Sequence, residues 1–102
     1  MQARLNSNIP SKKIANFCKR HHIRKLSLFG SVLRDDFTPE SDLDILVEFD
    51  SAHIPGFIRL AGMEIELTEI LGRKADMRTA QDLSRYFRED VIKSAKVQYA
   101  EG

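Results

Sequence analysis

The sequence predicts a small α+β domain in which helices pack on one face of a β-sheet. Some segments alternate polar with apolar residues, which is typical of strands, and others repeat apolar residues at helical spacing. The chain has 102 residues, enough for one domain with one modest core. We therefore expect a single domain over residues 1–102, in which residues 1–10 form an irregular lead-in.

The first expected helix follows this lead-in. Ser11 is a candidate N-cap, and apolar or partly apolar residues then recur at helical spacing on one face: Ile14, Phe17, Cys18 and His21. Basic residues gather at the C-terminal end of this helix, where they suit the macrodipole. We interpret the basic residues within 19–25 as a solvated helix end, with contact to RNA or to an acidic partner as the alternative.

Two strands and a short turn are expected next. Residues 25–29 alternate and predict a strand that ends at Gly30, followed by a helical turn over 32–35. Residues 38–41 predict a loop, because Pro39 disfavours helix in the residue before it. Residues 42–49 alternate again and predict a second strand.

The second half of the chain predicts a long helix, a short strand and a final helical region. Apolar spacing from Phe57 predicts a helix that stops near Gly72, and residues 74–78 predict a third strand. Thr79 or Asp82 is the expected cap of a last helical region that extends to about residue 100.

Composition excludes several classes of protein. The net charge of +1 gives no general attraction to nucleic acid, so we do not expect direct nucleic-acid binding. No apolar run is long enough to span a membrane, and no signal sequence is present, so we expect a cytoplasmic protein. Cys18 is the single cysteine, which excludes an internal disulfide, and its place on the apolar helix face predicts a buried thiol.

Three carboxylates are expected on the polar face of the sheet. Side chains of a strand alternate between its two faces, so Asp42 and Asp44 point away from the apolar residues of their strand. Asp76 takes the same position in the third predicted strand, with an ordinary strand-edge charge as the alternative. Carboxylate oxygens are hard ligands that suit Mg²⁺. The pattern therefore predicts a metal site formed by these three residues.

A Gly-Ser turn lies between the first two predicted strands. Gly30 permits backbone angles closed to other residues, and Ser31 offers a hydroxyl beside the amides that open the next helical turn. Arg34 is a candidate phosphate contact one turn later, with pairing to a nearby carboxylate as the alternative. Ser41 is a candidate for orienting the loop before Asp42. Together these residues predict a site for a triphosphate.

Two segments carry a resemblance to a known family: residues 27–34 (SLFGSVLR) and residues 41–47 (SDLDILV). They resemble the nucleotidyltransferase motif of the DNA polymerase β-like superfamily. The chain looks most like the minimal nucleotidyltransferases (MNT) that serve as antitoxins to HEPN-domain toxins. The resemblance is strongest over 23–49 and continues more loosely to about 78. It implies the minimal polymerase β-like fold, with a small mixed sheet.

The resemblance also implies an activity. In the family, the Gly-Ser turn binds the β- and γ-phosphates of ATP, and the three carboxylates are catalytic residues that hold Mg²⁺, usually two ions. The HEPN-linked members are thought to transfer AMP from ATP to a tyrosine of the toxin, a ribonuclease, and also to form a complex with it. The short chain leaves no further domain for an acceptor, so we expect a partner protein to bring it.

Two alternatives stay open at this point. One is a non-catalytic antitoxin that retains the fold and neutralises its partner by binding alone. The other is a nucleotidyltransferase that acts on RNA or on a small hydroxyl compound. The segment 34–36 (RDD) departs from the Arg-Gly-Glu or Arg-Gly-Asp that members often carry there, a difference that affects a loop and no ligand.

Overall fold

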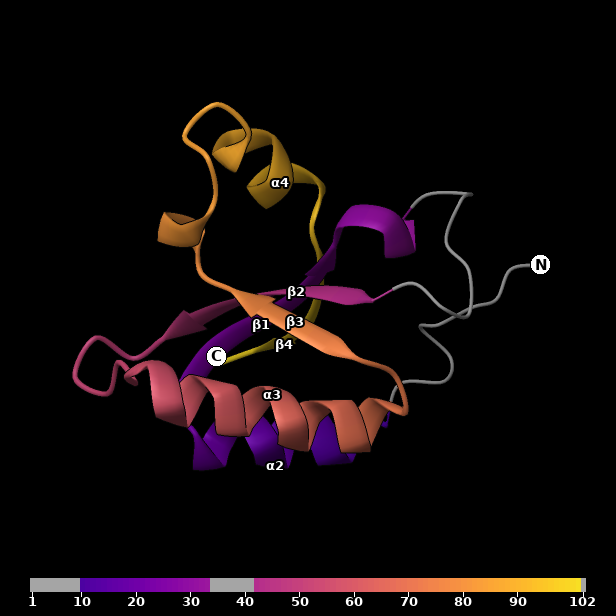
Figure 1. The fold of residues 1–102 in the computed structure, drawn as a ribbon, viewed down its shortest axis with the longest axis vertical. Helices are drawn as coiled ribbons and strands as arrows, with labels where there is room; N and C mark the ends of the chain where they lie inside the picture. Colours follow the sequence, from indigo (N-terminus) through magenta and orange to yellow (C-terminus); the bar gives the residue numbers. More distant parts are fainter. Residues whose placement is uncertain (1–9, 34–41, 102) are drawn as a thin grey trace.

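The fold is built on a single four-stranded mixed sheet, seen in a computed structural model that describes residues 10–33 and 42–101 (Figure 1). The strands lie in the order β3-β2-β1-β4. β1 pairs antiparallel with both β2 and β4, whereas β2 and β3 are parallel. The bounds are β1 Ile23–Phe29, β2 Leu43–Phe49, β3 Ala75–Arg78 and β4 Lys96–Ala100.

Two long helices cover one face of this sheet, as the sequence predicts. They are α2 (Ser11–Arg20) and α3 (Phe57–Leu71), which contact each other and lie beneath the strands in Figure 1, with α2 partly behind α3. The 3-10 turn η2 (Ala80–Asp82) and the short helix α4 (Arg88–Ser94) stand on the other side of the sheet. A further 3-10 turn, η1 (Gly30–Leu33), follows β1 directly.

The core lies between the sheet and the two long helices. Alternate residues of the strands point toward α2 and α3 and are buried there, which leaves the polar residues of the same strands on the opposite face. Cys18 belongs to this core, and burial raises the pKa of its thiol to about 12. The predicted buried thiol is confirmed. The buried apolar residues are Ile14, Phe17, Cys18, Ile23, Leu26, Leu28, Leu43, Ile45, Val47, Met63, Leu67, Ala75 and Met77.

The C-terminal end of α3 agrees with the sequence prediction, whereas the N-cap of α2 differs from it. Gly72 adopts left-handed backbone angles (φ +74°) after α3, and its N–H donates to the Thr68 carbonyl at 2.8 Å. The expectation that Ser11 caps α2 is wrong. Pro10 is the N-cap, because its carbonyl accepts the first helical hydrogen bond, from the Ile14 N–H at 3.0 Å.

The C-terminal segment corrects the predicted final helix. Thr79 does begin a helical turn, in which its N–H donates to Asp82 Oδ2 at 3.0 Å. However, α4 ends at Ser94, Ala95 is extended, and Lys96–Ala100 forms strand β4 along β1. Local spacing favours helix here, but the free edge of β1 offers a full row of hydrogen bonds that only the folded chain can supply.

Within the described part of the chain, no helix is both long and apolar enough to cross a bilayer. The predicted lead-in lies outside the described residues, except for Pro10.

Candidate active site

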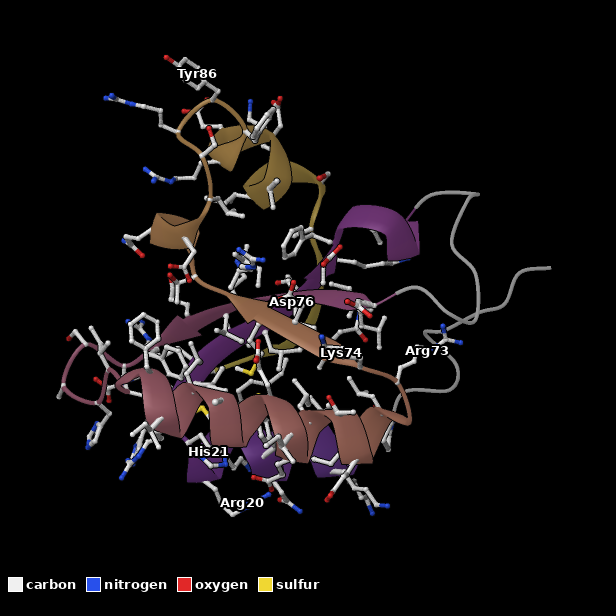
Figure 2. The ribbon with its side chains drawn as sticks, viewed as in Figure 1. Arg20, His21, Arg73, Lys74, Asp76 and Tyr86 are labelled. Carbon is white, nitrogen blue, oxygen red and sulfur yellow. The ribbon has the colours of Figure 1, made fainter. Side chains whose placement is uncertain are left out.

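Two of the three predicted carboxylates lie side by side on the polar face of the sheet. Asp44 of β2 and Asp76 of β3 are register partners in the parallel pair. Each is partly buried, and its neighbours along the strand are buried against the helices. Figure 2 shows Asp76 on the side of β3 that faces away from α2 and α3. The fold therefore brings together two carboxylates that lie far apart in the sequence.

Asp42 stands at the entry to β2 and is exposed. The strand begins one residue later, where the Leu43 N–H donates to the Lys74 carbonyl at 2.8 Å and ties β2 to the start of β3. Among the described residues, no group of three His, Cys, Asp or Glu side chains is arranged to hold a metal ion. Asp44 and Asp76 are thus aligned by strand pairing, whereas Asp42 lies at the less constrained end of the strand.

Gly30 lies directly against the Asp44 carboxylate. Phe29, which precedes it, is the register partner of Asp44 across the β1–β2 pair. Gly30 has φ +77°, and a Cβ placed on it would lie 2.3 Å from Asp44 Oδ2. No other residue fits this position without displacing the carboxylate. The Gly-Ser turn and the carboxylate pair therefore form one continuous site.

The remaining predicted ligands are only partly described. Ser31 lies in η1, but the position of its side chain is outside what the structure describes. Arg34 and Ser41 lie outside the described residues altogether. Their roles at the triphosphate stay predictions.

The residues present fit a magnesium ion that is shared with a substrate. Mg²⁺ is usually bound by one or two carboxylates together with phosphate oxygens and water, and not by a complete cage of protein ligands. The Asp44–Asp76 pair supplies the carboxylates. Gly30 leaves the space beside Asp44 free of a side chain of its own, so that a phosphate can approach closely.

Two side chains of α3 hold the strand that carries Asp76, and the sequence interpretation missed their role. The Ala75 N–H donates to Thr68 Oγ1 at 3.0 Å, and the Met77 N–H donates to Glu64 Oε2 at 2.7 Å. These are the amides on either side of Asp76, and β3 is an edge strand. Glu64 and Thr68 therefore occupy hydrogen-bond donors that an edge leaves open and fix the position of Asp76. Their spacing of four residues on one helix face was the available signal.

Arg78 is a second residue whose place at the site the sequence interpretation missed. It stands two residues after Asp76 on β3, so both side chains share the polar face. Its Nε lies 3.3 Å from Asp76 Oδ1 and its Nη2 lies 3.2 Å from Asp76 Oδ2. The guanidinium thus faces both oxygens of the carboxylate.

A cavity of about 520 Å³ continues the polar face beyond the carboxylate pair. It lies between the sheet and the elements η2 and α4 and reaches the later residues of β2, whereas Gly30 lies near the beginning of β2. Its floor includes Ser27, a buried polar side chain. The lining residues are Lys25, Ser27, Leu46, Val47, Glu48, Phe49, Ser51, Ile54, Thr79, Ala80, Gln81, Ile92, Ala95 and Val97.

The predicted basic patch over residues 19–25 is divided: Arg20 and His21 lie away from this site, whereas Lys25 lies on β1 and lines the cavity. Figure 2 shows Arg20 and His21 in the helical layer, on the far side of the sheet from α4. Both contact Glu66 of α3: Arg20 as an ion pair, and His21 through Nε2 at 2.9 Å from Oε1. Hydrogen bonds from Arg20 and His21 lower the pKa of the Glu66 carboxyl. These contacts favour the interpretation of a solvated helix end for Arg20 and His21.

A carboxylate pair lies next to a glycine turn on the polar face of a mixed sheet, and comparison with known proteins shows the family of the chain. The profile of the family described as "Nucleotidyltransferase domain" matches residues 11–98. The chain belongs to this family, and it is a nucleotidyltransferase.

Relatives of known name indicate which kind of nucleotidyltransferase the chain is similar to. "Putative protein adenylyltransferase MJ0435" of Methanocaldococcus jannaschii is 30% identical over 91 residues, which are 89% of this chain and 96% of the relative. "Protein adenylyltransferase MntA" of Thermococcus cleftensis is 34% identical over 59 residues, 58% of either chain.

Solved structures share the fold. The structure of a "putative minimal nucleotidyltransferase" aligns with a TM-score of 0.73 at 27% identity and covers 92% of this chain and 95% of the other. A toxin-antitoxin structure with AMP-PNP aligns with a TM-score of 0.71 at 20% identity, over 89% of this chain and 73% of the other. A complex of a tri-AMPylated Shewanella oneidensis HEPN toxin with an MNT antitoxin aligns with a TM-score of 0.65 at 20% identity, over 95% and 73%. The fold is that of the minimal nucleotidyltransferases.

Proposed function

We propose that this protein is an MNT antitoxin that transfers AMP from ATP to a tyrosine of a HEPN-domain toxin and also binds that toxin. The observation that carries the proposal is the register pairing of Asp44 with Asp76 beside Gly30. It is supported by relatives named as protein adenylyltransferases and by the fold shared with an MNT antitoxin in complex with a HEPN toxin.

In the proposed reaction the residues of this chain mainly hold the charged groups of the substrate in position. Gly30 and Ser31 bind the β- and γ-phosphates, assisted by Arg34, and Ser41 orients the loop before β2. Asp42, Asp44 and Asp76 would hold Mg²⁺, which would supply neutralisation of phosphate charge and activation of the attacking hydroxyl. Asp76 takes the proton of that hydroxyl. The tyrosine oxygen forms a bond to the α-phosphorus, and the bond from this phosphorus to the β-phosphate bridging oxygen breaks, so pyrophosphate leaves.

The cavity on the polar face is the proposed entrance for the acceptor. Displacement at phosphorus runs in line, so the attacking hydroxyl enters opposite the leaving pyrophosphate. If the pyrophosphate is held at Gly30, the hydroxyl enters from the later part of β2, where the cavity opens. Its lining combines apolar residues such as Leu46 and Ile92 with a few polar groups, which suits an aromatic side chain with a hydroxyl.

A labelling experiment tests the proposed reaction. The purified chain is incubated with Mg²⁺, ATP labelled on the α-phosphate, bulk tRNA, and the protein encoded next to it. We expect label on the partner, located by mass spectrometry on a tyrosine. Complex formation without label would favour the binding antitoxin, and label on tRNA alone would favour the transferase of RNA. Omission of Mg²⁺ should abolish the label.

A cavity-filling variant tests the acceptor entrance. Ile92 lines the cavity and is 48% exposed, so Ile92→Trp should narrow the cavity without disturbing the core. We expect kcat/KM for the partner to fall about fivefold or more, a loss on the order of 1 kcal/mol in transition-state binding. Ile65→Trp is the matched control, because Ile65 is 64% exposed on α3, across the sheet. If kcat/KM for the partner is the same in both variants, the cavity is not the entrance for the acceptor.

A further inference from the structure

Arg78 occupies the Asp76 carboxylate at the position where a cation is expected to bind. The guanidinium faces the carboxylate in a fork, with distances of 3.3 Å (Nε to Oδ1) and 3.2 Å (Nη2 to Oδ2). Both side chains project from β3 onto the face that also carries Asp44. A metal ion bound by Asp76 would therefore compete with the guanidinium for the same pair of oxygens.

The surroundings of Arg78 are acidic on several sides. Hydrogen bonding to Asp76 is the main cause of a raised pKa for Arg78, and the charge of Asp76 adds to it. The charges of Asp82 and Asp44 raise this pKa further. An arginine stays protonated at any ordinary pH, so the guanidinium is a permanent positive charge among these three carboxylates. The guanidinium of Arg78 therefore already places a positive charge at the site when no metal ion is bound.

The Arg78–Asp76 pair is exposed enough to be displaced. The side chain of Arg78 is 48% exposed and that of Asp76 is 31% exposed. Ion pairs that are open to water change an equilibrium by no more than about fivefold, because solvent screens them. A divalent ion that also binds phosphate oxygens can gain more than the ion pair contributes, and so displace Arg78 from Asp76. A divalent ion without phosphate ligands binds more weakly, because Arg78 still competes with it for Asp76.

We propose that Arg78 is an internal counter-ion that holds Asp76 until a divalent cation displaces it, and that it weakens metal binding in the absence of nucleotide. This inference rests on the proposed function, because it takes Asp76 to be a metal ligand. Arg78 is then a positioning residue: it keeps the carboxylate oriented and neutralised in the resting protein.

The test measures Mn²⁺ affinity without nucleotide, by electron paramagnetic resonance of the free ion. Mn²⁺ is the probe because it prefers the same oxygen ligands as Mg²⁺. We expect Arg78→Gln to bind Mn²⁺ about two- to fivefold more tightly than the unaltered chain. Arg59→Gln is the matched control: it removes the same charge from an exposed position on α3, across the sheet, and should leave the affinity unchanged.

A double-mutant cycle separates direct competition from a general effect of charge. In an Asp76→Asn background, the Arg78→Gln change should lose most of its benefit, because no carboxylate remains to be released. An equal gain in both backgrounds, or no gain in either, would refute the role of Arg78. If folded unaltered protein and Arg78→Gln both fail to bind Mn²⁺, the proposed metal site fails, and this inference with it. Mn²⁺ binding that is unchanged by Arg78→Gln refutes this inference and leaves the proposed function intact.

Discussion

Replacing both aspartates of β2 and its entry, as Asp42→Ala/Asp44→Ala, should lower the rate of AMP transfer by a factor on the order of 10³ or more. Metal ions contribute several kcal/mol of charge stabilisation at a transferring phosphoryl group, and each 1.36 kcal/mol corresponds to a factor of ten in rate. The double substitution removes two of the three proposed ligands. The rate is measured with labelled ATP and the partner protein under single-turnover conditions.

The same variant distinguishes catalysis from binding. Asp42 is exposed and Asp44 is partly buried on the polar face, so neither belongs to the core, and the fold should persist. We expect the variant to retain its complex with the partner, as measured by size-exclusion chromatography. Glu69→Gln is the control, because Glu69 is an exposed carboxylate on α3, across the sheet from the metal site and the cavity. Full transfer by the double variant would show that the proposed ligands are not required.

Gly30→Ala should lower transfer by about 10²-fold and also destabilise the chain. Two effects combine at this position. A side chain at φ +77° is strained, which costs roughly 1–3 kcal/mol. In addition, the new Cβ would lie 2.3 Å from Asp44 Oδ2, so the carboxylate must move. A displacement of about 1 Å at a reacting centre is enough to cost two orders of magnitude in rate.

The chain offers a control that separates these two effects. Gly72 has nearly the same backbone angle, φ +74°, but a Cβ placed there would have nothing within 4 Å. Gly72→Ala should therefore lower the free energy of unfolding by a similar strain without changing the transfer rate. Unfolding in urea and the labelled-ATP assay measure the two quantities. If Gly30→Ala and Gly72→Ala transfer AMP equally well, then contact of Gly30 with Asp44 is not important for the reaction.

Much of the fold could be predicted because its signals are local. The spacing of Ile14, Phe17 and Cys18 identifies the buried face of α2, and all three are buried in the structure. The left-handed angle at Gly72 follows from its place at the end of an apolar helical pattern. Strand β4 was missed because its partner, β1, lies far away in the sequence, and local spacing shows only what a segment favours by itself.

The candidate site, like the fold, has features that the sequence predicts and features that only the structure shows. Alternation along a strand is a local property, so the sequence by itself determined that Asp44 and Asp76 point away from the core, and it marked Gly30 as a turn. Only the tertiary structure decided that Asp44 lies opposite Asp76, because register between parallel strands depends on how distant segments pair. It also decided that Glu64 and Thr68 of α3 hold the edge of β3. These contacts join a helix to a strand that follows it in the chain, and their partners are set by how the two elements pack, whereas Arg78 and Asp76 share a face by the alternation of one strand.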